Sequence, residues 1–500
     1  MPKDKQADTS QPYAELRLEE LDEGTIRNLF RHASDVVVAR MYSDSDPGRL
    51  NPLLVYCTGM IDSAMLNEFL YQQSNGLLKR DSSEEPAISL EDRNMKRIQD
   101  PDAGDQLVRN VFSGQLALCF DKPRTLFVIP MSKPPQRTPE ESSTEISIKG
   151  PRDGFTEEVD VNVALIRKRL KTPTLAVEYF YTGSRSQTKI ALLYVTDVTN
   201  PQYVEEARIR IQGIHADGVL ASQQVEEGIS DSSSSLFPLM DSIGRPDYAA
   251  DSLLNGRFVV VVDGSPMVLL GPTTLTTMLK SPEDLHLPYY FVSMERLLRL
   301  LGFIVAVFLP GFWVGISSFS LDQIPFPLLA TVVVSRLGLP LSGPIDLFLM
   351  LGMFELFREA GMRLPKAVGQ TVAVVGGLIV GDAAISAGLT GPTTLVISAV
   401  TAVASFTLVN QSLTGSVTVI RFFVLAMSCL FGMFGFFISL FMIVVYLSSL
   451  TSFGVPFMAP ITPLSYRDVL FALLSVPWKK YRRRAAFYSP LDPDRQKENS

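Results

Sequence analysis

The pattern of apolar and polar residues changes abruptly near Met294. Before that residue, apolar and polar positions alternate in short runs, and no apolar run is long enough to cross a bilayer. Between residues 300 and 466 charges become sparse, with none from 383 to 420 and none from 422 to 466. A membrane-spanning helix needs about 20 mostly apolar residues, because the hydrocarbon core is about 30 Å thick. The pattern therefore predicts a large water-soluble domain followed by an all-α, multi-spanning membrane domain.

Two stretches of the soluble part match each other. Residues 114–130 and 256–272 align without a gap, with glycine, aspartate and proline at the same offsets. Each reads as an apolar strand, an Asp-led turn and a second apolar strand, which predicts a β-hairpin. Upstream, residues 53–58 resemble residues 191–196, and both are followed by a polar turn and a helix-like segment. Two matches at nearly the same offset favour an internal duplication.

The duplication gives the expected domain organisation. We expect an α/β domain made of two similar subdomains, residues 25–135 and 151–290, joined by a linker at 136–150 and preceded by a mobile tail at 1–24. The Ser-rich run 230–235 is expected to be a mobile loop. The transmembrane helical domain is expected at residues 291–455, followed by a C-terminal tail at 456–500.

Five apolar segments are expected to supply about six crossings. Pro310 should kink the first of them, and the last should consist of two helices joined near Gly432 and Gly435. The second segment contains several prolines, which favours a short re-entrant piece followed by a helix. The segments are residues 300–318, 324–357, 367–389, 393–409 and 417–450.

Charge and composition suggest a compartment. The chain has a net charge of -7 and no basic stretch that suggests a nucleic acid as partner. Its first residues lack the apolar core of a secretory signal, so we expect the soluble domain to stay in the cytoplasm. The basic residues between Lys479 and Arg484 mark a cytoplasmic flank after the last span. Both chain ends are therefore expected in the cytoplasm, with an even number of crossings.

The residues that usually carry catalysis form no recognisable pattern. Cys57, Cys119 and Cys429 lack paired or metal-ligand spacing, so we expect inert thiols. The three histidines stand apart from carboxylate or cysteine partners, and no phosphate-binding loop or nucleophile motif is present in the sequence. We therefore expect no enzymatic activity, no metal and no cofactor.

Ionisable residues in the membrane segments are the candidate functional residues, because a charge in that environment is costly and tends to face a cavity or a bundle interior. The candidates for an ion path or gate are Asp346, Glu355, Arg358, Glu359, Asp382 and Arg421. The alternative for the group from Glu355 to Arg363 is helix-surface ion pairing. The alternatives for Asp382 are lining an aqueous path or pairing with Arg421. Asn410 and Gln411 are expected at a loop or helix end.

Several long motifs resemble one family. They are FELFREAGMRLP at 354–365, VGGLIVG at 375–381, AGLTGP at 387–392, TAVASF at 401–406, SFGVP at 452–456, GPRDGFT at 150–156, RPD at 245–247 and VDGSP at 262–266. Together they resemble the A subunit of bacterial spore germinant receptors, the GerA type, over roughly residues 50–485. The stretch before FELFREAG often carries a glutamate in that family, whereas Asp346 is its only acid here.

The resemblance implies structural roles for a set of motif residues: Gly150, Pro151, Arg152, Gly154, Asp263, Gly264, Gly361, Pro365, Gly381 and Pro392. It also implies a subunit of a nutrient-sensing complex in the inner membrane of dormant spores. The implied partners are a transporter-like B subunit that binds the germinant, a lipoprotein C subunit and further copies of the same chain. Ion release on germinant binding is the implied activity. A small-metabolite transporter and a structural scaffold for the germinant-binding subunit remain alternatives.

Overall fold

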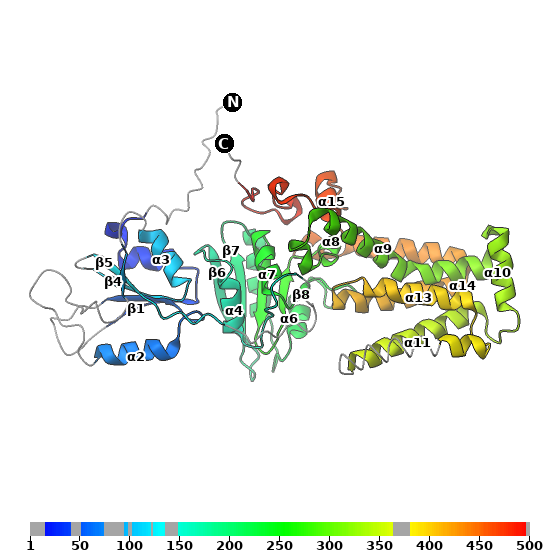
Figure 1. Ribbon diagram of the computed structural model, residues 1–500, viewed down its shortest axis with the longest axis horizontal. Helices are drawn as coiled ribbons and strands as arrows, with labels where there is room; N and C mark the ends of the chain where they lie inside the picture. Colours follow the sequence, from blue (N-terminus) through cyan, green and yellow to red (C-terminus); the bar gives the residue numbers. More distant parts are fainter. Residues whose placement is uncertain are drawn as a thin grey trace, which may run out of the picture. The chain divides into compact units, whose positions relative to one another are not determined.

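The computed structural model describes residues 16–41, 52–74, 95–98, 103–121, 124–135, 149–363 and 381–496 (Figure 1). The chain forms two compact units. The α/β unit contains residues 1–233, 242–272 and 482–500, and the helical unit contains residues 234–241 and 273–481. Each unit is described by itself below.

The first half of the α/β unit is a five-stranded sheet with strand order β1-β2-β4-β5-β3. Helices pack on both faces: the core on one face contains residues of α1 and α3, and the core on the other contains residues of α2. The strands are β1 Val36–Arg40, β2 Leu53–Cys57, β3 Lys96–Arg97, β4 Leu116–Phe120 and β5 Thr125–Ile129. The helices are α1 Glu23–Leu29, α2 Ser63–Ser74 and α3 Ala103–Val111.

The second half has the equivalent order, β6-β7-β9-β10-β8. Helices α4 and α7 share one core with the sheet, while α5 and α6 contact its strands β6 and β10. The strands are β6 Leu175–Thr182, β7 Thr188–Val195, β8 Asp241–Ile243, β9 Phe258–Val262 and β10 Val268–Gly271. The helices are α4 Val159–Arg167, α5 Pro201–Gln212, α6 Ser222–Ile229 and α7 Pro246–Leu254.

The predicted duplication is confirmed. Both matched stretches form antiparallel hairpins, β4 with β5 and β9 with β10, in equivalent places of the two sheets. Lys122 and Pro123 in the first turn lie outside the described residues. The shared glycine before each hairpin has a left-handed backbone, with φ of 83° at Gly114 and 89° at Gly256. A side chain is disfavoured there, which explains why glycine recurs at that offset.

The two halves are joined by a buried ion pair. Arg167 on α4 donates from Nε to Asp35 Oδ2 at 2.8 Å and from Nη2 to Asp35 Oδ1 at 2.7 Å. The guanidinium also donates to the carbonyls of Thr172 and Leu175 and lies 4.4 Å from the centre of the Phe112 ring. Its side chain is 0% exposed and that of Asp35 is 4% exposed. The pair therefore balances its own charge in the interior.

Backbone pairing and one thiol complete this junction. A parallel bridge joins Ala33 to Val177, with Val177 N donating to His32 O at 2.9 Å. The Cys57 thiol donates to Asp35 Oδ2 at 3.5 Å. Burial raises the pKa of Cys57, and it raises the pKa of Cys119 to about 12. Both thiols are free and buried.

The helical unit begins with short elements and continues as long apolar helices. The expected first span starts earlier than predicted, because α9 already begins at Tyr289. The unit contains α8 Leu275–Met278, α9 Tyr289–Val314 with a π-helical turn Gly315–Phe319, α10 Phe326–Arg336, α11 Gly343–Arg363, α13 Pro392–Phe406, α14 Gln411–Ser449 and α15 Tyr466–Leu473. A two-stranded sheet pairs β11 Thr451–Ser452 with β12 Val455–Pro456.

The predicted joint in the last apolar segment is confirmed. Gly432 has φ of 60° and ψ of -139°, so α14 consists of two helical stretches that meet there. A Cβ at this position would lie 2.7 Å from the Phe319 ring, which leaves room only for glycine. The second segment forms the short α10 followed by the longer α11, and the re-entrant path of the short piece stays a prediction.

Two helical stretches, 289–319 and 411–449, are long and apolar enough to cross a membrane, and α10 and α13 are shorter apolar helices. Most of the predicted glycine-rich span at 367–389 lies outside the described residues.

The contacts divide the chain differently from the expected boundaries at two places. Residues 234–241, which begin inside the Ser-rich run, pack into the helical unit, where the Phe237 side chain is 1% exposed and its ring centre lies 5.9 Å from that of Phe457. Residues 482–500, expected to be a tail, belong to the α/β unit. Arg484 donates there to Leu254 O at 2.7 Å. Specific contacts, such as those of Phe237 and Arg484, therefore anchor segments whose composition suggested loops.

Replacing Arg167 by Met should destabilise the full chain by about 3–5 kcal/mol, because Asp35 keeps its buried charge without a partner. The double change Asp35→Asn with Arg167→Met should recover part of the loss. The matched control is Arg185→Met, whose ion pair with Asp217 is 83% and 70% exposed and should contribute less than about 1 kcal/mol. Unfolding midpoints of the four proteins test this, and equal losses for Arg167 and Arg185 would contradict it.

Candidate functional site

Three of the six predicted candidates meet inside the helical unit. Glu355 and Arg358 lie on α11, and Arg421 lies on α14. Glu359 is exposed on α11, and Asp382 is exposed in the helical turn at residues 381–386. Asp346 is buried near the start of α11. The structure therefore separates the candidates into a central cluster, a buried carboxylate at a helix junction and two exposed acids.

The Glu355 cluster consists of Glu355, Arg358, Ser405 and Arg421. Glu355 forms an ion pair with Arg358, three residues further along the same helix. Its other carboxylate oxygen accepts from Arg421 Nη2 at 3.1 Å, and Arg421 Nη1 donates to Ser405 Oγ on α13 at 3.0 Å. One carboxylate therefore holds two guanidinium groups and links α11, α13 and α14.

Helix packing places Arg421 in the interior. It belongs to a buried stripe of α14 that also contains Val417, Val424 and Ser428. One turn further along α14, Val424 faces Gly311 of α9. A Cβ atom added to Gly311 would lie 2.7 Å from the Val424 side chain, so the two helices pack closely there. The Arg421 side chain is 3% exposed, and its Nε is buried with no hydrogen-bond partner among the described residues. The apolar sequence around it gave no sign of this close packing.

Asp346 lies in the first turn of α11, and its side chain contacts the start of α13. Its Oδ2 accepts from the backbone N of Gly391, the N-cap of α13, at 3.4 Å, and the residue is 2% exposed. A carboxylate at a helix N-terminus is favoured by the unpaired N–H groups and the helix dipole. Nearby Arg336 ends α10 and donates to Ser317 O at 2.9 Å and Ser317 Oγ at 3.0 Å. These two charges therefore tie helix ends together.

The proposed pairing of Asp382 with Arg421 is not observed, because Arg421 contacts Glu355 and Ser405 instead. Glu355 and Arg358 form the i, i+3 ion pair of the helix-surface alternative, but Glu355 also pairs with the buried Arg421. The side chain of Arg363 lies outside the described part of the chain. Asn410 is at a helix end, as predicted: it caps α14 by accepting from Leu413 N at 3.0 Å. It also donates to Asp241 Oδ1 at 2.8 Å, a buried contact that no sequence pattern indicated.

The motif residues mostly shape the backbone. Asp263 Oδ1 accepts from Val159 N at the start of α4, and Gly264, with φ of 79°, donates to Glu157 O at 2.7 Å. Gly154 is buried, whereas Arg152 is exposed. Pro365 lies outside the described residues, and the remaining positions are Gly150 and Pro151 before α4, Gly361 on α11, Gly381 at the start of the helical turn and Pro392 at the first position of α13.

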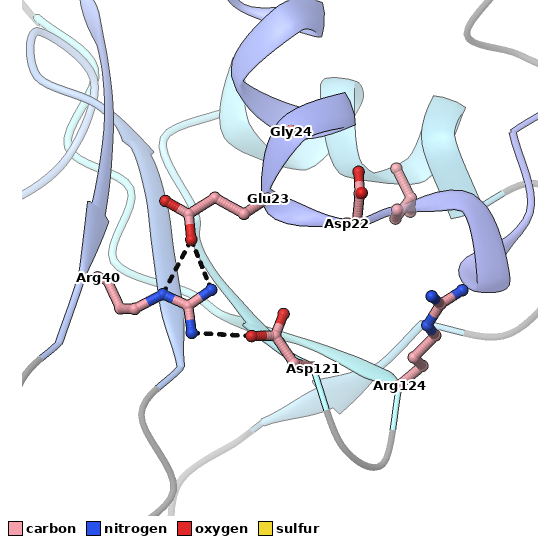
Figure 2. Close-up of a pocket in the computed structure, with 7 residues that line it drawn as sticks. Asp22, Glu23, Gly24, Arg40, Asp121 and Arg124 are labelled. Atoms are coloured by element: carbon pink, nitrogen blue, oxygen red, sulfur yellow. Dashed lines mark hydrogen bonds and ion pairs between the residues drawn. The ribbon is translucent and has the colours of Figure 1, made fainter.

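A cavity of about 600 Å³ opens in the first subdomain between the start of α1 and the β4–β5 turn (Figure 2). Arg40 crosses it, donating to Glu23 at 2.9 Å and pairing with Asp121 at 2.8 Å. Hydrogen bonds from Arg27 and Arg40 lower the pKa of Glu23. These charges are compensated within the wall, and the described residues contain no cluster of potential metal ligands. The remaining lining residues are Leu21, Asp22, Gly24 and Arg124.

Comparison with known proteins decides the family. The family model described as "Bacillus/Clostridium GerA spore germination protein" matches residues 24–487. This chain belongs to the GerA spore germination protein family. Spore germination protein XA of Bacillus anthracis is 38% identical over 486 residues, which cover 97% of this chain and 99% of that protein. The family resemblance expected from the motifs is therefore confirmed.

Other GerA-related proteins match over much of the chain. Spore germination protein KA of Bacillus subtilis (strain 168) is 32% identical, over 93% of this chain and 85% of that protein. The uncharacterized membrane protein YfkQ of the same organism is 34% identical, over 77% and 75%. The crystal structure of the N-terminal domain of the A subunit of the Bacillus megaterium spore germinant receptor GerK3 matches with 26% identity and a TM-score of 0.38, covering 52% of this chain and 95% of that one.

The family match indicates a general role in spore germination. The GerA family description names spore germination and no catalytic activity. One relative is named a membrane protein, and the two long apolar stretches of this GerA-family chain suggest membrane association.

Replacing Asp346 by Asn should lower the stability of the GerA-family chain by about 0.5–2 kcal/mol, because the negative charge at the α13 N-terminus is lost. Thermal unfolding of the full chain in detergent measures the change. Asp322→Asn is the matched control, since Asp322 is an exposed acid of the same unit and should change the midpoint little. A loss of the same size in both variants would show that the contact with Gly391 contributes nothing specific.

Proposed function

We propose that this chain is the A subunit of a spore germinant receptor, and that its helical unit forms an ion-conducting path in an oligomer of the chain. Germinant binding to a partner subunit opens the path, and the α/β unit transmits that event. The observation that carries the proposal is the similarity to spore germination protein XA along nearly the whole chain.

The chemistry of the helical unit supports a path for ions. Its apolar helices carry a cluster of two arginines and one glutamate in which Arg421 is buried, and ionisable groups in such helices tend to mark ion pathways. Asp382 is an exposed acid on the same unit, available to face either water or a neighbouring chain. A simple scaffold for another subunit has no need of these charges.

The proposal includes partners and topology. The partners are a transporter-like B subunit, a lipoprotein C subunit and further copies of this chain, and nucleic acid is not among them. The helical domain at residues 291–455 crosses the spore inner membrane several times, with both chain ends in the cytoplasm. The basic residues between Lys479 and Arg484 support a cytoplasmic flank after the last crossing.

Asp382→Asn should slow the release of monovalent cations from germinating spores several-fold while leaving the protein level unchanged, because an acid lining the path loses its charge. Asp322→Asn should release ions at the normal rate, since Asp322 lies outside the proposed path. Flame photometry of the medium and immunoblots of spore membranes provide the two readings. Normal protein and normal release in Asp382→Asn would remove this residue from the path.

Reporter fusions at Ser10 and at Ser500 should both report the cytoplasm. This follows from the basic flank after the last span and an even number of crossings. The same reporter fused to an exported protein serves as the control for reporter activity. An external location of either end would contradict the proposed topology.

A further inference from the structure

We propose that the Glu355 cluster is an anion-binding site, and that its ligand is a singly charged carboxylate. The inference goes beyond the proposed function, because it does not depend on ion conduction.

The first argument is the charge of the cluster. Arg358 and Arg421 share the single carboxylate of Glu355, which leaves one positive charge over. The Arg421 side chain is only 3% exposed, so water does little to screen this charge. Glu359, the next acid on α11, is exposed. A buried charge is costly unless an opposite charge compensates it, so the cluster favours an added anion.

The second argument is the hydrogen-bonding capacity of the two arginines. Arg421 Nε, Arg358 Nε and Arg358 Nη1 are buried and have no hydrogen-bond partner among the described residues. These atoms are donors only, so a matching ligand must supply acceptors. A carboxylate has two oxygens with about four acceptor sites, which suits several separate N–H groups better than a single-atom anion does.

The third argument is access. The side chains of Arg358 and Glu355 are 21% and 27% exposed, in contrast to Arg421. The cluster therefore reaches the surface of the helical unit on the α11 side. A carboxylate can arrive there as a soluble small molecule or as an acidic side chain of a second copy of this chain, and the chemistry of recognition is the same.

The test uses the purified full chain in detergent and sodium acetate as the probe. Acetate replaces sodium methanesulfonate at constant ionic strength, because a sulfonate is a much weaker hydrogen-bond acceptor. The unfolding midpoint should rise along a saturable curve. Arg358→Gln removes the excess charge and two of the donors, so its half-saturating acetate concentration should increase about tenfold or more. Lys480→Gln, which removes an exposed charge of the same unit, should behave as the unchanged protein.

Glu355→Gln is the second variant, in case Arg358→Gln does not fold. It raises the excess charge of the cluster, so its curve should saturate at a lower acetate concentration. Light scattering on the same samples separates the two sources of the carboxylate. If a second copy supplies it, acetate will have no effect on the unchanged protein, and Arg358→Gln will dissociate the oligomer while Lys480→Gln will not.

Two results would overturn the inference. One is the absence of an acetate effect together with an unchanged oligomer in Arg358→Gln. The other is an equal response of Arg358→Gln and Lys480→Gln, which would mean that only the overall charge of the chain matters. Ion release from spores is not measured here, so either result leaves the proposed function standing.

Discussion

A charged side chain that leaves water must find an opposite charge and hydrogen-bond partners, and two arginines meet this constraint differently. Arg167 pairs with the carboxylate of Asp35, donates to two carbonyls and packs on an aromatic ring. Its charge is therefore neutralised and its guanidinium is well hydrogen-bonded. Arg421 shares one carboxylate with Arg358, and its Nε is a buried donor with no hydrogen-bond partner in the described part of the chain. The Arg167 pair fixes the two subdomains against each other. The Glu355 cluster keeps one uncompensated positive charge, which favours the binding of an anion.

The sequence predicted the α/β unit well because its signals are local. Alternating strands, an Asp-led turn and a glycine with a left-handed backbone recur at the same offsets, and each specifies its own hairpin. The junction between the subdomains was not predictable in this way. Asp35 and Arg167 are 132 residues apart, and neither stands in a pattern that names its partner. Which residues pair across such a separation in sequence depends on the tertiary structure, which local composition does not predict.

In the helical unit, apolarity predicted the existence of helices better than their limits. Helix α9 starts well before the apolar segment because Arg296 and Arg299 remain helical, paired with Asp284 at 2.8 and 2.9 Å. The glycine joint at Gly432 was predictable, since glycine alone tolerates the backbone found there. The partner of Arg421 was not, because Asp382 and Glu355 are both acids in apolar surroundings and only packing distinguishes them.

The chain passes between the two units several times. Four peptide connections join them, at residues 233–234, 241–242, 272–273 and 481–482, where a simple tandem arrangement has one. At the connection 241–242, Asp241 is the first residue of β8. It accepts a hydrogen bond from Asn410, the N-cap residue of α14. Both residues belong to the helical unit, and removing one partner of this buried hydrogen bond costs about 1–3 kcal/mol. The start of the helix that holds Arg421 is therefore held by a residue 169 positions away in the sequence, which no local pattern could indicate.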